Sequence, residues 1–488
     1  MKKLFALTAV ATATTILPAE DLVLNDDHTV TVDASSTETI SDKVTGPGRI
    51  ILLGGGTLVL NNAENDFTGG IVISNGIVRA DASGALGTGP IMLEGTNALR
   101  QVQFNAAGGV FANSITLCTT GTANDVVYVM KNATVNGNMM TSPDYCDTKN
   151  YFKIRVGETK GEPTHDASGF AQPKTELNGE VNAARFNVVG CGSLLCKQKV
   201  TVSNTAQFGY TSDDRGCVYL YDPRNEIAYL LLKAFDVVCK EENVLYNCNV
   251  RFSYGWGPNG HGFIILDGFN QQFRYINYSE GNAYTLMRRD GNCCGLKTNN
   301  SYPATVTLIG PGSTYGYGRL VGPVSIVVDK APESETMYQR FVYRKNDMTG
   351  TFILKNGSCY WMNGVEFSNL ENLLQTGGTF QFNSVTNCCP KLRKMEVSGG
   401  TVEFKKSCKD VFNADLTDLH LSSSAKFYIA SGFTNTVRSL YLDGKRMFAG
   451  VYTFENLPAM AHEKEAEIGN YAGALIVRRG RYLHLLVR

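Results

Sequence analysis

Residues 54–90, GGGTLVLNNAENDFTGGIVISNGIVRADASGALGTGP, decide the fold of this chain. They contain short alternating apolar segments that close at Asn, Asp or Gly, as Thr57 to Leu60 do before Asn61. Alternate apolar residues turn one side of a strand toward the core, and glycine supplies the positive φ that tight corners need. Gly56 and Gly76 lie 20 residues apart, which indicates a short repeating unit.

The same unit returns much later in the chain, beginning at Gly350, Gly377 and Gly399. Gly378 and Gly400 lie 22 residues apart there. A period of roughly 20 to 28 residues built of strands and tight turns is typical of a solenoid, in which each strand pairs with its equivalent one turn along at ~4.8 Å. We therefore predict an all-β parallel β-helix of roughly 20 turns, continuous over residues 20–488. Residues 225–240 (NEIAYLLLKAFDVVCK) fit either a helix or two buried strands.

Composition agrees with this fold and excludes some functions. Gly is frequent, at 50 of 488 residues, and 43% of residues are hydrophobic, which is enough for a large core. The 45 Lys plus Arg balance 45 Asp plus Glu, so no whole-chain field attracts nucleic acid or an anionic membrane.

The first residues predict export. Residues 1–19, MKKLFALTAVATATTILPA, combine a basic start with an apolar stretch too short to span a membrane, as in a secretory signal peptide. No later window approaches 18 uninterrupted apolar residues, so we expect no transmembrane segment and an extracellular or cell-surface location.

Residues 54–90 also resemble the autotransporter-associated β-strand repeat, and weaker echoes of this repeat cover much of the chain. The resemblance implies a right-handed, single-stranded parallel β-helix of the pectin-lyase-like type, displayed as a passenger. Because residues 478–488 (RRGRYLHLLVR) bring no translocator barrel, we expect a separate secretion or anchoring partner, with 437–488 as a C-terminal cap region. The matching residues are Gly54, Gly56, Thr57, Leu58, Leu60, Asn65, Phe67, Thr68, Gly69, Gly70, Gly76, Ala85, Leu86, Gly87, Gly89 and Pro90.

One set of residues suggests catalysis. Asp213, Asp214, His261 within Gly-His-Gly, and Arg274 follow the order of polygalacturonase motifs, which pair two carboxyl groups across a glycosidic bond. The upstream Asn-Thr-Asp motif of those enzymes is missing, and each fragment is common by chance in a Gly-rich chain.

Other chemistry finds little support. The six histidines are scattered, no zinc, calcium-nonapeptide or phosphate-loop spacing occurs, and we assign no metal, cofactor or catalytic residue. Thirteen cysteines, including the adjacent pairs 293–294 and 388–389, fit either disulfides between stacked strands or buried thiols. Tyr254 with Trp256, and Tyr315 with Tyr317, fit either sugar-stacking ladders or internal stacks, and we favour internal stacks.

The sequence therefore predicts a secreted or surface-displayed structural, adhesin-like passenger protein without a catalytic site, binding a surface glycan or a protein ligand. The alternative is a polysaccharide-binding or pectin-lyase-like, polysaccharide-degrading protein that uses Asp213, Asp214, His261 and Arg274.

Overall fold

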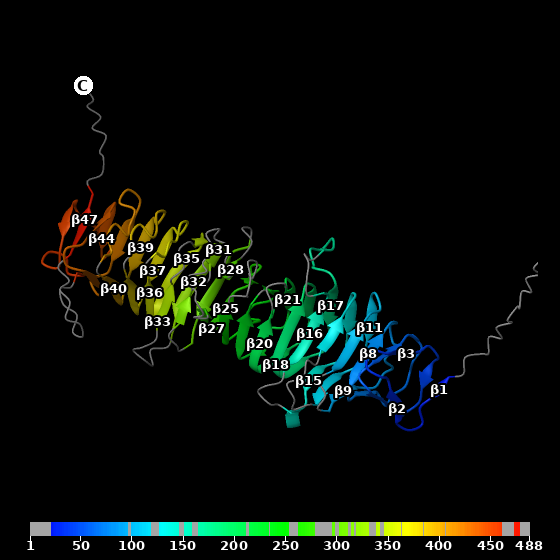
Figure 1. The fold of residues 1–488 in the computed structure, drawn as a ribbon. Helices are drawn as coiled ribbons and strands as arrows, with labels where there is room; N and C mark the ends of the chain where they lie inside the picture. Colours follow the sequence, from blue (N-terminus) through cyan, green and yellow to red (C-terminus); the bar gives the residue numbers. More distant parts are fainter. Residues whose placement is uncertain are drawn as a thin grey trace, which may run out of the picture.

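The chain forms an elongated rod in which strands stack along the long axis from one end to the other (Figure 1). The predicted all-β parallel β-helix is confirmed, because nearly all strand pairs are parallel and no α-helix occurs among the described residues. The one helical element there is the 3-10 turn η1 (Pro143–Tyr145). The computed structural model describes residues 21–95, 99–118, 126–145, 151–158, 164–210, 214–233, 235–252, 262–278, 295–297, 302–310, 314–316, 319–330, 338–341, 346–362, 364–383, 385–405, 407–460 and 473–478.

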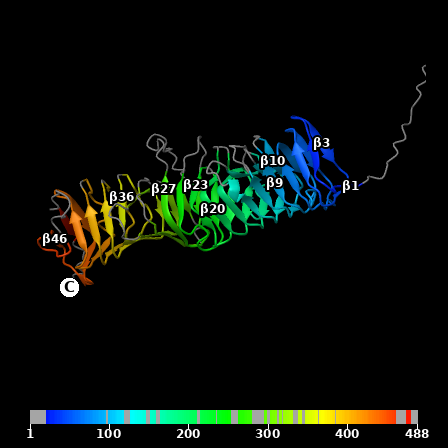
Figure 2. The same ribbon diagram turned by 90° about the horizontal axis from the view of Figure 1, so that it is seen from below.

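Each turn of the coil crosses three faces, and the strands of each face lie side by side along the rod (Figures 1 and 2). Face 1 consists of β2 (His28–Thr31), β5 (Ile50–Leu53), β7 (Ile71–Ile73), β9 (Ile91–Glu94), β12 (Ile115–Cys118), β15 (Met139–Thr141), β18 (Val181–Gly190), β20 (Val200–Phe208), β22 (Glu226–Ile227), β27 (Gln271–Tyr278), β29 (Ala304–Leu308), β32 (Val324–Asp329), β35 (Thr351–Asn356), β37 (Asn372–Gln375), β39 (Lys394–Val397), β41 (Asp418–Leu421) and β44 (Ser439–Leu442).

Face 2 follows face 1 in every turn. The long strands β18, β20 and β27 run from face 1 into face 2, so much of the two faces forms one 26-stranded sheet. The other strands of face 2 are β3 (Thr37–Ile40), β6 (Thr57–Leu60), β8 (Gly76–Ala80), β10 (Arg100–Phe104), β13 (Val126–Val129), β16 (Phe152–Val156), β23 (Tyr229–Leu232), β25 (Cys248–Phe252), β30 (Thr314–Gly316), β33 (Tyr338–Phe341), β36 (Ser358–Trp361), β38 (Thr379–Phe382), β40 (Thr401–Phe404) and β42 (Lys426–Ile429).

Face 3 closes the triangle, mainly through a 10-stranded sheet. Its strands are β1 (Leu22–Val23), β4 (Val44–Thr45), β11 (Gly109–Phe111), β14 (Ala133–Val135), β17 (Lys174–Leu177), β19 (Ser193–Cys196), β21 (Cys217–Leu220), β24 (Asp236–Cys239), β26 (Phe263–Ile265), β28 (Gly295–Lys297), β31 (Arg319–Gly322), β34 (Asp347–Met348) and β43 (Thr434–Val437).

The length of a turn varies along the rod. Thr57 and its axial partner Ile77 are 20 residues apart, whereas Ala133 and Thr175 are 42 apart, because loops around β16 lengthen that turn. The rod therefore has fewer turns than the roughly 20 that the repeat length predicts. Residues 225–240 form β22, β23 and β24, so the helical alternative for them is wrong.

A single continuous core fills the coil, and alternate residues of each strand face it. In the C-terminal half this core is aromatic: the Phe382 and Phe404 rings stack with centroids 4.7 Å apart, and those of Trp361 and Phe367 are 4.2 Å apart. Trp361, Phe382 and Phe404 hold equivalent positions in successive turns, whereas Phe367 follows Trp361 in the same turn.

The two ends of the rod are closed differently. In the first described turn, His28 and Glu38 occupy the inward positions that Ile50 and Leu58 hold one turn later. Charged or polar groups at inward positions of an edge discourage another sheet from stacking on it. At the other end, β45 (Lys445–Arg446) pairs antiparallel with β44, and β46 (Gly450–Tyr452) pairs antiparallel with β47 (Ala474–Val477), which lies parallel to β43.

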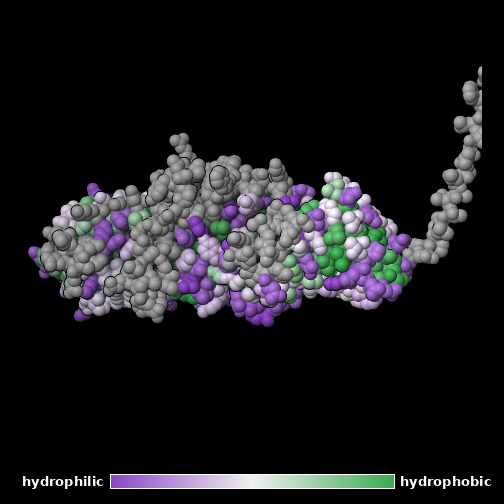
Figure 3. All heavy atoms as spheres, turned by 60° about the horizontal axis from the view of Figure 1, so that its bottom comes forward, coloured by the Kyte–Doolittle hydropathy of each residue, from purple (hydrophilic) through white to green (hydrophobic). Residues whose placement is uncertain are grey.

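The outer surface also changes along the rod. Near the N-terminal end, apolar side chains gather on the outside of face 1, where Ile51, Val72 and Met92 are consecutive partners (Figure 3). Among the described residues, no helix is long and apolar enough to cross a membrane.

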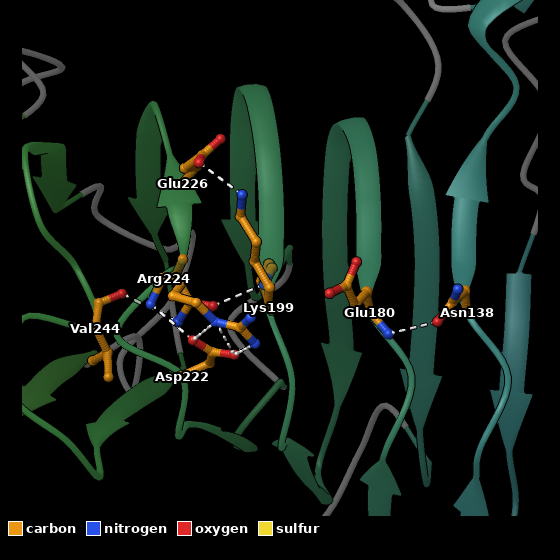
Figure 4. Close-up of polar contacts among 9 residues, drawn as sticks. Asn138, Glu180, Lys199, Asp222, Arg224, Glu226 and Val244 are labelled. Atoms are coloured by element: carbon orange, nitrogen blue, oxygen red, sulfur yellow. Dashed lines mark hydrogen bonds and ion pairs between the residues drawn. The ribbon is translucent and has the colours of Figure 1, made fainter.

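Buried asparagines connect successive turns at corners of the coil: Asn225 lies between faces 3 and 1, and Asn65 lies between faces 2 and 3. Asn225 accepts a hydrogen bond from the Val200 amide (2.8 Å) and donates one to the Val244 carbonyl (3.2 Å), so one side chain links three turns (Figure 4). Asn65 does the same between Val44 and Ala85. Asn65, which is among the residues that match the repeat pattern, therefore has a structural role.

Replacing Asn225 with leucine is expected to lower the free energy of unfolding by about 2–4 kcal/mol, because two buried backbone groups lose their partners. Glu226, beside it, forms an exposed ion pair with Lys199 at 2.7 Å (Figure 4). Glu226→Gln should cost under about 1 kcal/mol. Denaturant titration of both variants checks this, and equal losses would contradict the role of Asn225.

Candidate functional site

The outer side of face 2 carries polar and aromatic side chains over seven consecutive strands, from β13 to β27. These residues alternate with core residues: Asn187, for example, lies between the fully buried Phe186 and Val188. We call this set the face-2 strip. It comprises Tyr128, Lys153, Arg155, Arg185, Asn187, Gln207, Tyr229, Asn249, Arg251 and Tyr275.

Strand register places part of the strip in one line along the rod. Lys153 pairs with Asn187, Asn187 with Gln207, and Gln207 with Leu231, which in turn pairs with Arg251. With a strand spacing of ~4.8 Å, the line from Lys153 to Arg251 is roughly 19 Å long. A linear molecule along the rod axis would therefore contact several turns at once.

Two amides of this line are buried although they face outward. Asn187 and Gln207 are each 5% exposed. Gln207 donates to the Gly209 carbonyl at 3.2 Å, whereas the buried Oδ1 of Asn187 accepts no hydrogen bond. Buried polar atoms in proteins nearly always have a partner, so an unused acceptor on an outer surface suggests a donor supplied from outside.

Each arginine of the strip contacts a tyrosine of the preceding turn. The Arg155 guanidinium lies 5.3 Å from the centroid of the Tyr128 ring. Arg185 lies 5.1 Å from the Tyr151 ring and donates to its hydroxyl at 3.2 Å. The planar cation and the ring thereby hold each other in position.

The same arrangement continues toward β25. Arg251 donates to the Tyr229 hydroxyl at 3.3 Å, and the Lys233 ammonium, at the edge of the strip, lies 5.1 Å from the Tyr210 ring. The strip thus presents repeated aromatic and cationic groups.

Burial is the main influence on the pKa values of the strip. The pKa of Lys153 is lowered, first by burial and then by repulsion from Arg155, while attraction by Asp214 opposes the change. Burial likewise lowers the pKa of Lys233. The pKa of Tyr128 rises to about 12 because of burial and the carboxylate of Glu158, which accepts its hydroxyl hydrogen at 2.9 Å.

Asp214, predicted as a candidate catalytic carboxylate, has a structural position. Its side chain is 1% exposed and accepts hydrogen bonds from the backbone amides of Gly190 (2.8 Å) and Tyr210 (2.7 Å). These bonds tie together the ends of β18 and β20. A carboxylate engaged in this way is poorly placed to take a proton from a ligand.

Arg274 is the other described residue of the proposed catalytic set, and it lies far from Asp214. Arg274 lies in β27, three strand spacings beyond β20 and therefore at least about 14 Å along the rod from the turn of Asp214. Asp213 and His261 lie outside the described residues. The two members of the set that are described are thus not brought together.

Ten cysteines are described, and no disulfide bond joins any two of them. The sulfur atoms of Cys388 and Cys389 are 3.8 Å apart, which is a hydrogen-bond contact and not a disulfide bond. Burial raises the pKa of Cys196 to about 12, so this thiol is not a ready nucleophile. Within the described part of the chain, no group of three or more His, Cys, Asp or Glu side chains could hold a metal ion.

Most residues of the aromatic pairs named from the sequence lie outside the described part of the chain. Tyr254, Trp256 and Tyr317 lie outside the described residues, and Tyr315 lies on β30. The tyrosines of the face-2 strip were not singled out from the sequence. The available signal was a polar or aromatic residue at the outward position of each strand.

Comparison with known proteins gives no relative: no family model, no curated protein and no solved structure matches the chain. The resemblance of residues 54–90 to the autotransporter-associated repeat stays a prediction that rests on that motif.

Proposed function

We propose that the protein is a secreted or surface-displayed, adhesin-like rod that binds a polysaccharide along the face-2 strip. The observation that carries this proposal is the pair of buried, outward-facing amides, Asn187 and Gln207, among tyrosines and arginines. Sugar rings stack their C–H faces on aromatic side chains, and their hydroxyls both donate to and accept from amide and guanidinium groups.

A binding role is better supported than a degrading one. Glycoside hydrolysis needs two carboxyl groups facing the scissile bond, and Asp214 is occupied by backbone amides. Export by residues 1–19, an extracellular or cell-surface location, and a separate secretion or anchoring partner belong to the same proposal.

The test is a polysaccharide array probed with purified protein from residue 20 onward, with release of reducing sugars measured in the same wells. We expect binding without release. Release that is abolished by Asp214→Asn in a folded protein would instead support the enzymatic alternative.

Tyr229→Ala should weaken binding of any ligand found on the array by about 3- to 10-fold, because a stacking surface is lost. Tyr246→Ala is the matched control, since Tyr246 is 52% exposed and lies outside the strip. Equal effects of the two variants, or none, would place the binding surface elsewhere.

A further inference from the structure

We infer that the ligand of the face-2 strip is a polyanionic glycan, one that carries carboxylate or sulfate groups as well as free hydroxyls. This inference rests on the proposed function and adds the chemical class of the ligand. It follows from the charges of the strip and from its unused hydrogen-bonding groups.

The described part of the protein forms no ion pair with the cations of the strip. Among the described residues, no ion pair includes Lys153, Arg155, Arg185 or Arg251 of the strip, or Lys233 at its edge. Their partners are tyrosine rings and hydroxyls. These cations therefore keep their capacity to bind an anion.

Several cations elsewhere on the rod pair with carboxylates. Arg49 pairs with Asp27, Lys174 with Glu176, and Arg438 with Asp418. The two carboxylates associated with the strip are already engaged: Glu158 by the Tyr128 hydroxyl and Asp214 by two backbone amides. The described part of the strip therefore carries an excess of positive charge, although the chain has no net charge.

Unused hydrogen-bonding groups of two kinds occur together in the strip. The buried Nε atoms of Arg155, Arg185 and Arg251 are donors without an acceptor, and the buried Oδ1 atoms of Asn187 and Asn249 are acceptors without a donor. Carboxylate or sulfate oxygens suit the arginines, and sugar hydroxyls suit the amides.

A ligand has to satisfy both kinds of group. A neutral glycan offers donors to the amides but no charge to the arginines, and a simple polyanion such as polyphosphate offers the reverse. An acidic glycan offers both. Because the unused atoms are buried, the side chains that cover them have to move when a ligand binds.

The length of the strip indicates a chain rather than a single sugar. Arg155, Arg185 and Arg251 lie on β16, β18 and β25, which are four strand spacings apart from first to last, or roughly 19 Å. Strand register places Arg251 on the line of Lys153 and Asn187, and it places Arg155 and Arg185 two residues to either side of that line. Anionic groups repeated along a linear ligand that follows the line can reach all three long arginine side chains.

The experiment uses the full chain and pairs of glycans that differ only in charge. Polygalacturonate is compared with its full methyl ester, chondroitin sulfate with unsulfated chondroitin, and polyphosphate serves as an anion without hydroxyls. Affinities are measured by biolayer interferometry at a fixed ionic strength near 0.15 M, because charge-driven binding depends on salt. We expect at least one of the acidic glycans to bind, at least about tenfold more tightly than its less charged partner and than polyphosphate.

The variant Arg155→Gln/Arg185→Gln/Arg251→Gln should lose at least about tenfold in affinity for that acidic glycan. The matched control, Lys409→Gln/Lys426→Gln/Lys445→Gln, removes three exposed charges near the C-terminal end and should change it less than about twofold. The single variant Arg251→Gln and thermal melting of every variant separate a binding defect from a folding defect.

The possible failures are distinct. If the methyl ester and unsulfated chondroitin bind as tightly as the acidic forms, the charge inference is overturned and the proposed function stands. If polyphosphate binds equally well, or the control variant loses as much as the arginine variant, the interaction is non-specific attraction and the inference is overturned. If no glycan binds, the proposed function falls with it.

Discussion

Trp361→Ala is expected to lower the free energy of unfolding by about 3–5 kcal/mol, among the largest losses from a single side chain in this rod. Trp361 is fully buried, on β36. Its ring stacks on Phe367 at 4.2 Å and contacts Phe380 at 5.0 Å and Phe382 at 5.4 Å. Truncation therefore opens a cavity between turns as well as removing contacts.

The effect should be concentrated in the C-terminal half, because a solenoid turn contacts mainly its neighbours. Relative to the unsubstituted protein, Trp361→Ala should speed amide hydrogen exchange in β35, β36 and β38 more than in β5 to β9. Tyr360→Ala on the same strand is the control, since Tyr360 faces outward and is half-buried. A loss for Tyr360→Ala equal to that for Trp361→Ala would show that position on the strand, not core packing, sets the cost.

The fold could be predicted because its physical causes are local and repeated. Alternation and corner glycines recur every 20-odd residues, and the structure places those glycines on top of one another. A Cβ on Gly76 would lie 2.7 Å from the Gly56 carbonyl oxygen, and one on Gly400 would lie 2.3 Å from that of Gly378. The spacing seen in the sequence is thus the axial repeat of the coil.

Residues 225–240 were ambiguous because apolar residues there occupy both sides of the strands. Leu231 and Val238 face outward between core residues, and Val238 packs with Leu195 and Tyr219 in a small outer cluster. Such packing hides the alternation that distinguishes a strand from a helix.

The face-2 strip could not be predicted from spacing. Its arginines are 30 and 66 residues apart, at 155, 185 and 251, because loops of different lengths separate the strands. Only the stacking of strands brings them onto the same face, where Arg155 and Arg185 lie to either side of the line that contains Arg251. By contrast, Asp213-Asp214 and His261 drew attention as short motifs, and Asp214 proved to bind backbone amides.

Gly400→Ala should be nearly as costly as the tryptophan truncation, at about 3–5 kcal/mol. Gly400 has φ +79°, and an added Cβ would lie 2.3 Å from the Gly378 carbonyl oxygen and 2.9 Å from Nε2 of Gln375. That amide is itself part of the core, donating to the Gly378 and Thr401 carbonyls at 3.1 and 3.0 Å. The methyl group would therefore force adjacent turns apart and break hydrogen bonds between them.

Gly432→Ala separates this clash from the backbone conformation. Gly432 also has φ +79°, but nothing lies within 4 Å of its added Cβ. Its cost should be limited to about 1–2 kcal/mol, that of a left-handed conformation for alanine. Denaturant titration of both variants measures the difference, which we attribute to the stacking of turns. If the two variants lose equal stability, glycine is required at these corners only for its positive φ angle. Close axial contact between turns would then not explain the requirement.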